Sequence, residues 1–183
     1  FFVNNKKKLI ILLSIIILLI FSYFAFEEIS KNKKENLANK YNASTINYIS
    51  GNNNNIENEM IEIINLKDKA YSPLALYFLL DNNIINSREK VNGLFDILIE
   101  KTKLDKEIKN LIIYKKGLYN SDYETENNLL KILNPLINSK SIWKSHSLYL
   151  MAEYFFSKNE NQKAKEFFKK IITLENSNSQ IKI

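Results

Sequence analysis

The chain has 183 residues, of which 45% are hydrophobic and 25% charged, and 26 Lys plus Arg against 20 Asp plus Glu give a formal net charge of +6. The sequence contains no cysteine, which excludes disulfide scaffolds, thiolate zinc sites, iron–sulfur clusters and cysteine nucleophiles. A single histidine, His146, leaves little from which to build a serine triad or a two-histidine metal site. We therefore expect a protein that is not an enzyme, with no catalytic residues, no cofactor and no metal.

The excess of lysine does not point to nucleic acid. A nucleic-acid interface would gather basic residues on one face with aromatic partners, whereas the lysines of 103–109 and 163–170 alternate with glutamates. That alternation is typical of solvated helix faces. We expect no nucleic-acid partner.

An uncharged run covers residues 9–26, with the sequence LIILLSIIILLIFSYFAF. As a helix it rises about 27 Å, close to the hydrocarbon thickness of a bilayer. The run is longer than the apolar part of a usual signal peptide, its end at 23–26 lacks a small-x-small cleavage pattern, and it is apolar on every face. We therefore predict an uncleaved transmembrane helix over 9–26 that contacts the lipid bilayer through Leu9, Leu13, Ile17, Ile20 and Phe24.

The charges beside this run bear on its orientation. Three lysines at 6–8 precede it, while Glu27 and Glu28 follow it directly and three further lysines come at 31–34. Counted as lysines alone the flanks nearly tie, but the immediate flanks favour a cytoplasmic N-terminus. We predict a short cytoplasmic flank at 1–8, the span at 9–26 and one helical domain at 27–183.

Beyond the span, helical periodicity dominates. The anchor is predicted to continue as one long helix until Gly51, and the later apolar stripes predict helices over 56–64, 72–80, 91–99, 108–118, 124–137, 148–155 and 164–172. Ser72 before Pro73 reads as a helix start, and Ser121 with Glu124 as a capping box. Pro135 is expected to kink or end its helix. The fold class is thus all-α, with about four antiparallel helix pairs.

Three first helices begin near Ser72, Asp105 and Ile142, a step of 33 to 37 residues, and tetratricopeptide repeats have a period of 34. In the last pair, large, small and aromatic residues fall on the positions of the repeat pattern. Asn159 stands where the repeat has a turn glycine, while the earlier pairs keep the period without the small residues. We predict a tetratricopeptide-like α-solenoid, with an ordinary helical bundle as the alternative. The predicted repeat core is Leu148, Met151, Ala152, Phe155, Ala164, Phe168 and Ile171.

Three short segments support a family resemblance: AYSPLA at 70–75, WKSHSLYLMA at 143–152 and NQKAKEFF at 161–168. With the N-terminal anchor, they make the chain resemble the alphaproteobacterial branch of the tetratricopeptide-like proteins related to the ancillary subunit of the Sec translocon. The resemblance implies a single-pass inner-membrane protein with periplasmic repeats. Its implied partners are translocon subunits, a membrane-anchored prolyl isomerase and periplasmic chaperones. In such proteins another helix follows where 178–183 stop, so we expect a chain truncated at its C-terminus.

Repeats of this kind stack so that their first helices line a groove. Carried onto the last pair, the repeat pattern predicts a partner-binding groove formed by His146, Tyr149, Glu153 and Phe156. The alternative is that His146 and Glu153 are merely solvated and Phe156 covers the core. Trp143 is interpreted as a packing residue at a helix start.

Three functions of different class remain open. The first is a membrane-tethered scaffold beside the translocon, and the second is a cell-envelope assembly or cell-division adaptor with the same fold. The third, a membrane-bound enzyme, is disfavoured because the sequence has no carboxylate pair, glycine-rich phosphate loop or metal cluster.

Overall fold

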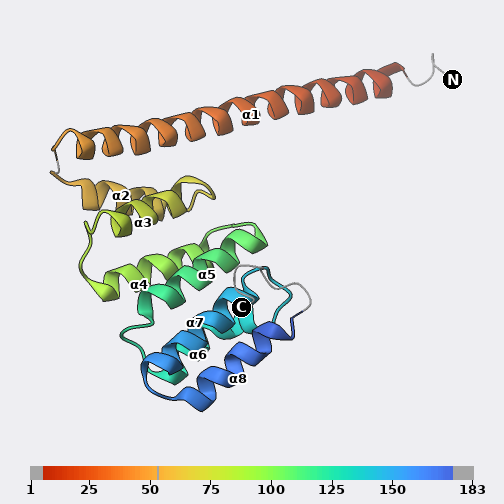
Figure 1. Cartoon of the computed structure of the whole chain (residues 1–183). Coiled ribbons are helices and arrows are strands. Elements are labelled where there is room, and N and C mark those ends of the chain that lie inside the picture. The colour runs from red at the N-terminus through yellow and green to blue at the C-terminus, as the bar shows by residue number, and fades with distance from the viewer. Residues whose placement is uncertain (1–5, 53, 175–183) are drawn as a thin grey trace. The chain divides into compact units, whose positions relative to one another are not determined.

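The computed structural model describes residues 6–52 and 54–174, with side chains from residue 10 onward. The regular elements in this part of the chain are all helices, joined by short turns, and it contains no strand (Figure 1). It divides into two compact units, Phe1–Asn54 and Asn55–Ile183. An all-α fold that opens with a long apolar helix is confirmed.

The first unit is a single helix, α1, over Lys6–Ile49. Its side chains from 10 to 26 are exposed, and the predicted anchor residues Leu13, Ile17, Ile20 and Phe24 are between 45% and 61% exposed. The side chain of the fifth, Leu9, lies outside the described residues. The helix is long and apolar enough to cross a membrane.

Two serines interrupt the apolar run without exposing an unsatisfied polar group. The hydroxyl of Ser14 donates to the carbonyl of Ile10 at 2.9 Å, and that of Ser22 donates to Leu18 at 2.8 Å. Because hydrocarbon offers no hydrogen-bond partner, polar groups in a span must be satisfied within the protein. The serines of α1 therefore fit a lipid environment.

The predicted continuation of the anchor helix is confirmed, because α1 runs on without a break to Ile49. Gly51 follows with φ 84°. Glycine adopts that left-handed conformation without steric cost, which explains why the helix ends here.

The second unit is built from short helices: α2 (Ile56–Asn65), α3 (Tyr71–Asp81), α4 (Arg88–Asp96), α5 (Lys106–Asn120), α6 (Glu126–Ile137), α7 (Lys144–Ser157) and α8 (Asn161–Ile172). A π-helical turn, η1 (Ile97–Lys101), extends α4. The most extensive packing is within three hairpins, α2 with α3, α5 with α6 and α7 with α8, while α4 and η1 pack on α5.

The pairing of α3 differs from the sequence analysis, which placed it with the following helix. In the structure α3 packs mainly on α2. The hydroxyl of Ser72, which is fully buried, donates to the carbonyl of Ile63 at 2.8 Å and so joins the start of α3 to the end of α2. This hydrogen bond contributes to a pairing that helical periodicity does not encode.

Two predicted helix starts were wrong. α3 begins at Tyr71, where the carboxylate of Asp68 accepts from the amide of Tyr71 at 2.9 Å, so Ser72 is not the cap. α6 begins after Thr125, whose hydroxyl accepts from the amide of Asn128, rather than at Ser121. Helix α6 ends at Ile137, as predicted, and because it continues through Pro135 the helix does not end at the proline. By contrast, Asn159 has φ 61°, as expected of a residue in place of a turn glycine.

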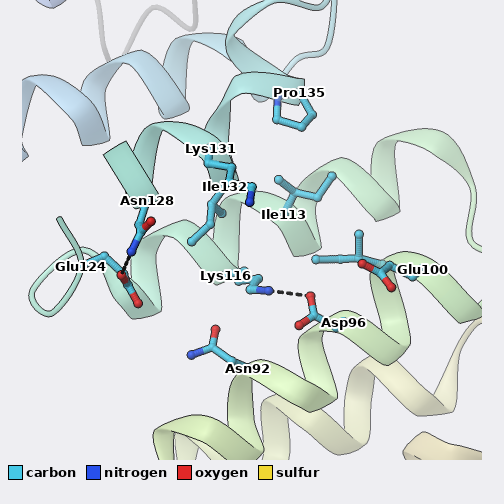
Figure 2. Close-up of a pocket in the computed structure, with 11 residues that line it drawn as sticks. Asn92, Asp96, Glu100, Ile113, Lys116, Glu124, Asn128, Lys131, Ile132 and Pro135 are labelled. Carbon is cyan, nitrogen blue, oxygen red and sulfur yellow. Dashed lines mark hydrogen bonds and ion pairs between the residues drawn. The ribbon is translucent and has the colours of Figure 1, made fainter. Parts of the chain in front are cut away.

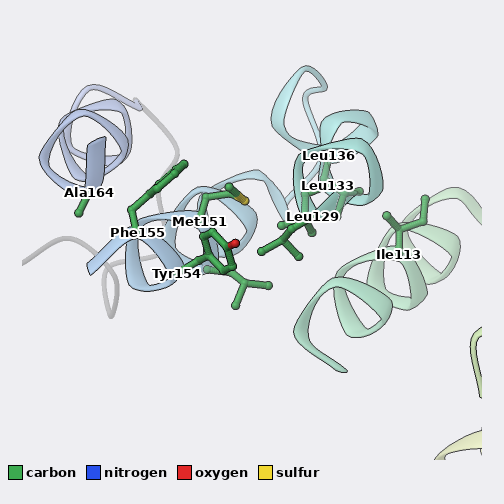
Figure 3. Packing of buried hydrophobic residues seen from close by; sticks show 9 residues of the cluster. Ile113, Leu129, Leu133, Leu136, Met151, Tyr154, Phe155 and Ala164 are labelled. Atoms are coloured by element: carbon green, nitrogen blue, oxygen red, sulfur yellow. The ribbon is translucent and has the colours of Figure 1, made fainter. Parts of the chain in front are cut away.

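The predicted repeat core lies inside the second unit. Six of its residues are at most 2% exposed, and Phe168 is half-buried. Part of this set joins residues of α5 and α6 in one apolar cluster (Figure 3). Its members are Ile113, Leu129, Leu133, Leu136, Leu150, Met151, Tyr154, Phe155 and Ala164.

The last two hairpins share one register. Helix α8 begins and ends 35 residues after α6, at 161 against 126 and at 172 against 137. The same offset relates the buried pairs Ile113 and Leu148, Leu129 and Ala164, and Leu136 and Ile171.

The shared register also corrects, at one position of the preceding pair, the prediction that small residues are missing from the earlier pairs. Gly117 stands 35 residues before Ala152 and is buried in α5. A Cβ atom at Gly117 would lie 2.5 Å from Cδ2 of Leu133 in α6. The two helices therefore approach closely at this glycine.

Candidate partner-binding surfaces

The four predicted groove residues lie along one stripe of α7. His146 and Tyr149 are half-buried, Glu153 is exposed, and Phe156 is 61% exposed. The spacing of three and four residues places all four on the same side of the helix. They differ in what surrounds them, and this decides which of them a partner can reach.

His146 belongs to an aromatic cluster between α5 and α7. Its ring lies 5.2 Å from that of Trp143 and 5.8 Å from that of Tyr114, and Tyr114 stacks on Trp143 at 5.6 Å. Burial raises the pKa of Tyr114. Nδ1 of His146 is buried and has no hydrogen-bond partner in the part of the chain that the structure describes. His146 and Trp143 thus contribute to packing between the last two hairpins.

Tyr149 and Glu153 form a second local arrangement. The ring of Tyr149 meets that of Phe168 in α8 edge-on at 5.8 Å. The carboxylate of Glu153 raises the pKa of Tyr149, with smaller contributions from burial and from their hydrogen bond. Glu153 and Phe156 are left as the two exposed residues of the predicted stripe.

The structure also contains a cleft that the sequence analysis did not predict. It has a volume of about 560 Å³ and lies over α5, between α4 with η1 on one side and α6 on the other (Figure 2). Both walls pack on α5 and have little packing with each other. The lining residues are Asn92, Asp96, Ile99, Glu100, Ile113, Lys116, Glu124, Asn128, Lys131, Ile132 and Pro135.

An ion pair joins the floor of the cleft to the wall formed by α4. The ammonium group of Lys116 in α5 donates to Asp96 of α4, and the side chain of Lys116 is only 15% exposed (Figure 2). On the opposite wall, Asn128 donates to the carboxylate of Glu124 at 2.8 Å. The isoleucine side chains between these polar groups give the cleft a mixed lining, suited to a segment with both apolar and polar groups.

A buried amide pair fixes the wall of the cleft formed by α4. Asn120, which is fully buried, donates to Oδ1 of Asn92 at 2.8 Å and accepts from Nδ2 of Asn92 at 3.0 Å. Asn120 also donates to the carbonyl of Lys116 at 2.8 Å. These bonds hold α4 against the end of α5.

The sequence carries only weak indications of the cleft. Its lining comes from four elements, and the π-turn η1 that supplies Ile99 and Glu100 interrupts an otherwise regular apolar stripe. Such turns are common at functional sites. Nothing in the residue types of 97–101 distinguishes a π-turn from an α-helix, so the cleft emerges only from packing.

None of the family models, curated proteins or solved structures compared with the chain matches it. Within the described residues, no group of three or more histidine, aspartate or glutamate side chains is arranged to hold a metal ion.

Proposed function

We propose that this protein is a membrane-anchored helical scaffold that binds protein partners at the periplasmic face of a bacterial inner membrane. One observation carries the proposal: an exposed, charge-free stretch at 10–26 belongs to the same unbroken helix as a polar segment that runs to Ile49. A continuous helix of this kind fits an anchor joined to a stalk. The second unit adds what a scaffold needs, a stack of helices with exposed apolar and charged surface.

The proposed partners are subunits of the Sec translocon and periplasmic folding factors, a chaperone or a prolyl isomerase. The sequence resemblance suggests these partners, and tethering supports them because it raises the local concentration of the scaffold at the membrane. The α7 stripe offers Glu153 and the 61% exposed Phe156 as contact residues. An aromatic side chain beside a carboxylate is a frequent combination at protein interfaces.

A cell-envelope assembly or cell-division adaptor is the second candidate, because the same anchor and the same α7 surface would serve another partner. We also propose that the protein is not an enzyme. If the chain turned over a substrate, and substitution of one polar cleft residue such as Asp96 or Lys116 abolished that turnover, this part of the proposal would be wrong.

In-cell photocrosslinking of the full-length, membrane-inserted chain tests the proposal. The photoreactive residue is placed at Phe156 in one variant and at Lys131, in the cleft, in another, with exposed Leu66 as the matched control. We expect translocon subunits or a periplasmic folding factor to be captured from Phe156 and not from Leu66.

The other outcomes are equally informative. Capture of division or outer-membrane assembly proteins alone would replace the first candidate by the second. Capture of cytoplasmic proteins from Phe156 would overturn the assigned topology, and capture from Lys131 alone would move the partner site from α7 to the cleft.

A further inference from the structure

One edge of the second unit repeats an exposed apolar side chain at a fixed spacing. Leu74, Ile108 and Ile142 are 34 residues apart and are 45%, 42% and 68% exposed. They lie in or just before the first turns of α3, α5 and α7, and Figure 1 shows that these three helices begin at the same edge of the unit. The spacing therefore places one exposed apolar side chain at each of three neighbouring helix starts.

Lysines surround these three apolar residues. The segments that enter the three helices contain eight lysines against four acidic residues, and they are 66–74, 100–109 and 138–144. Seven of the lysines are exposed, and none of the eight forms an ion pair within the described residues. We call these three segments the basic edge.

Two of the four acidic residues of the basic edge already bond to the protein. The carboxylate of Asp68 accepts from two backbone amides at the start of α3, at 2.8 and 2.9 Å, and that of Glu107 accepts from the hydroxyl of Ser141 at 2.7 Å. Both carboxylates belong to half-buried residues, whereas Glu100 and Asp105 are exposed. A ligand that approaches this edge therefore meets many more free ammonium groups than free carboxylates.

The opposite edge of the same unit differs in charge. The segments 81–90, 118–126 and 156–163 form it (Figure 1), and they contain four basic residues against six acidic ones. Exposed apolar side chains are present there too, among them Leu118 and Phe156 at 44% and 61%. Both edges therefore expose apolar surface, but the basic edge combines it with an excess of positive charge.

We propose that the basic edge binds the surface of a bilayer that contains anionic lipids. Ammonium groups pair with the phosphates of such a surface, and apolar side chains beside them enter the boundary between headgroups and acyl chains. The alkyl stems of the lysines can lie along apolar surface while their ammonium groups stay in water. Helix α1 supports a bilayer as the occupant, because a helix able to cross a membrane keeps the second unit at high local concentration beside the lipid.

A bilayer fits the basic edge better than an acidic protein does. Protein interfaces gather apolar side chains into a contiguous core, whereas Leu74, Ile108 and Ile142 are single side chains on three different helices, separated by lysines. A bilayer surface accepts such separate insertions. The proposal rests on α1 as an anchor, which is part of the proposed function, and does not depend on which partner the scaffold holds.

Quenching of tryptophan fluorescence by brominated lipid tests the contact. Trp143 is the single tryptophan and adjoins Ile142. The full chain is reconstituted in vesicles of phosphatidylcholine brominated near the headgroup end of its acyl chains, with or without phosphatidylglycerol, and quenching is the intensity relative to matched vesicles without bromine. We expect quenching about twofold stronger with phosphatidylglycerol, and high salt should remove the difference because it screens the attraction between charges.

Two double variants test the apolar contacts. Ile108→Asp with Ile142→Asp should reduce quenching to the level seen without phosphatidylglycerol. Leu118→Asp with Phe156→Asp makes the same changes at the other ends of α5 and α7 and should leave quenching unchanged. All four residues are exposed, so both variants should keep the fold, which far-ultraviolet circular dichroism checks.

Two further double variants test the charges. Lys101→Glu with Lys103→Glu should remove the dependence of quenching on phosphatidylglycerol. Lys131→Glu with Lys158→Glu changes the net charge equally, at exposed residues outside the basic edge, and should preserve that dependence.

Equal quenching in both kinds of vesicle, or quenching insensitive to Ile108→Asp with Ile142→Asp, would overturn the proposal. Binding of poly-glutamate to the basic edge without quenching by lipid would replace the bilayer by an acidic protein. Flotation of the chain with the vesicles separates this proposal from the proposed function. A chain that fails to float contradicts the anchor, whereas a chain that floats without quenching that depends on phosphatidylglycerol contradicts only the role of the basic edge.

Discussion

Close packing at single residues decides the stability of the second unit, and Gly117 is the clearest case. In a well-packed core, an added methyl group that forces its neighbours to move costs about 1–3 kcal/mol. Leu133 is fully buried, and its Cγ would lie 3.0 Å from a Cβ at Gly117 in addition to the closer contact with Cδ2. The clash therefore involves a side chain with little room to change rotamer.

We expect Gly117→Ala to lower the free energy of unfolding by about 1–3 kcal/mol for this reason. Gly93→Ala is the matched control, because a Cβ at this exposed helical position meets nothing within 4 Å. It should raise stability by about 0.4–1 kcal/mol. Urea unfolding in nanodiscs, followed by the fluorescence of the single tryptophan, Trp143, measures both. Equal midpoints for the two variants would contradict the close approach.

Tyr77 provides a prediction of pH dependence. Its hydroxyl is buried without a hydrogen-bond partner among the described residues, and burial, with the nearby carboxylate of Asp81, raises its pKa to about 12 from the ordinary 10.0. The folded state therefore favours the neutral phenol. The contribution of Tyr77 to stability is fully present below pH 10 and is lost as the pH rises from about 10 to about 12.

Tyr77→Phe should reduce this alkaline loss of stability. At neutral pH the variant should be as stable as the parent or slightly more so, because it removes a buried hydroxyl that makes no hydrogen bond. Urea midpoints at pH 7 and pH 11 measure the effect. A destabilised variant at pH 7 would show that the hydroxyl has a partner.

At the scale of elements, α1 combines two environments in one helix. The stretch at 10–26 is exposed and uncharged, whereas Ile46 and Ile49 are equally exposed on the polar segment that follows. An arginine at the centre of a membrane-spanning helix costs about 2.5–3.5 kcal/mol on insertion scales. The same substitution on a solvated helix face has little effect.

We expect Ile17→Arg with Ile20→Arg to release a substantial fraction of the chain from membranes at alkaline carbonate extraction. Ile46→Arg with Ile49→Arg applies the same change to the other half of α1 and should leave the chain in the membrane pellet. Extraction of both double variants to the same extent would argue against a span at 10–26.

For the whole molecule, the absence of cysteine makes topology directly measurable, because one introduced cysteine is the sole thiol. With the N-terminus in the cytoplasm, Ser157→Cys at the exposed end of α7 should react with a membrane-impermeant maleimide in intact spheroplasts. Asn4→Cys should react only after lysis. The reverse pattern would place the second unit in the cytoplasm and remove the periplasmic partners from consideration.

The sequence by itself determined the features that depend on local composition and periodicity. Such features depend on residues that are close to one another along the chain. They are the charge-free run at 9–26, the helix that continues to Gly51 and the apolar stripes of the later helices. The turn at Asn159 is equally local, because asparagine tolerates a left-handed backbone. These features follow from solvation and backbone sterics, which neighbouring residues set.

Tertiary structure alone decided the features that depend on contacts between distant residues. Helix α3 packs on α2, and the two helices are joined by the bond between Ser72 and Ile63. The close approach at Gly117 depends on Leu133, 16 positions along the chain. The cleft exists because α4 and α6 both pack on α5 and hardly on each other. The half-burial of His146 likewise depends on Tyr114 from another helix. Such contacts are set by how helices pack, and a pattern along one helix does not specify its neighbour.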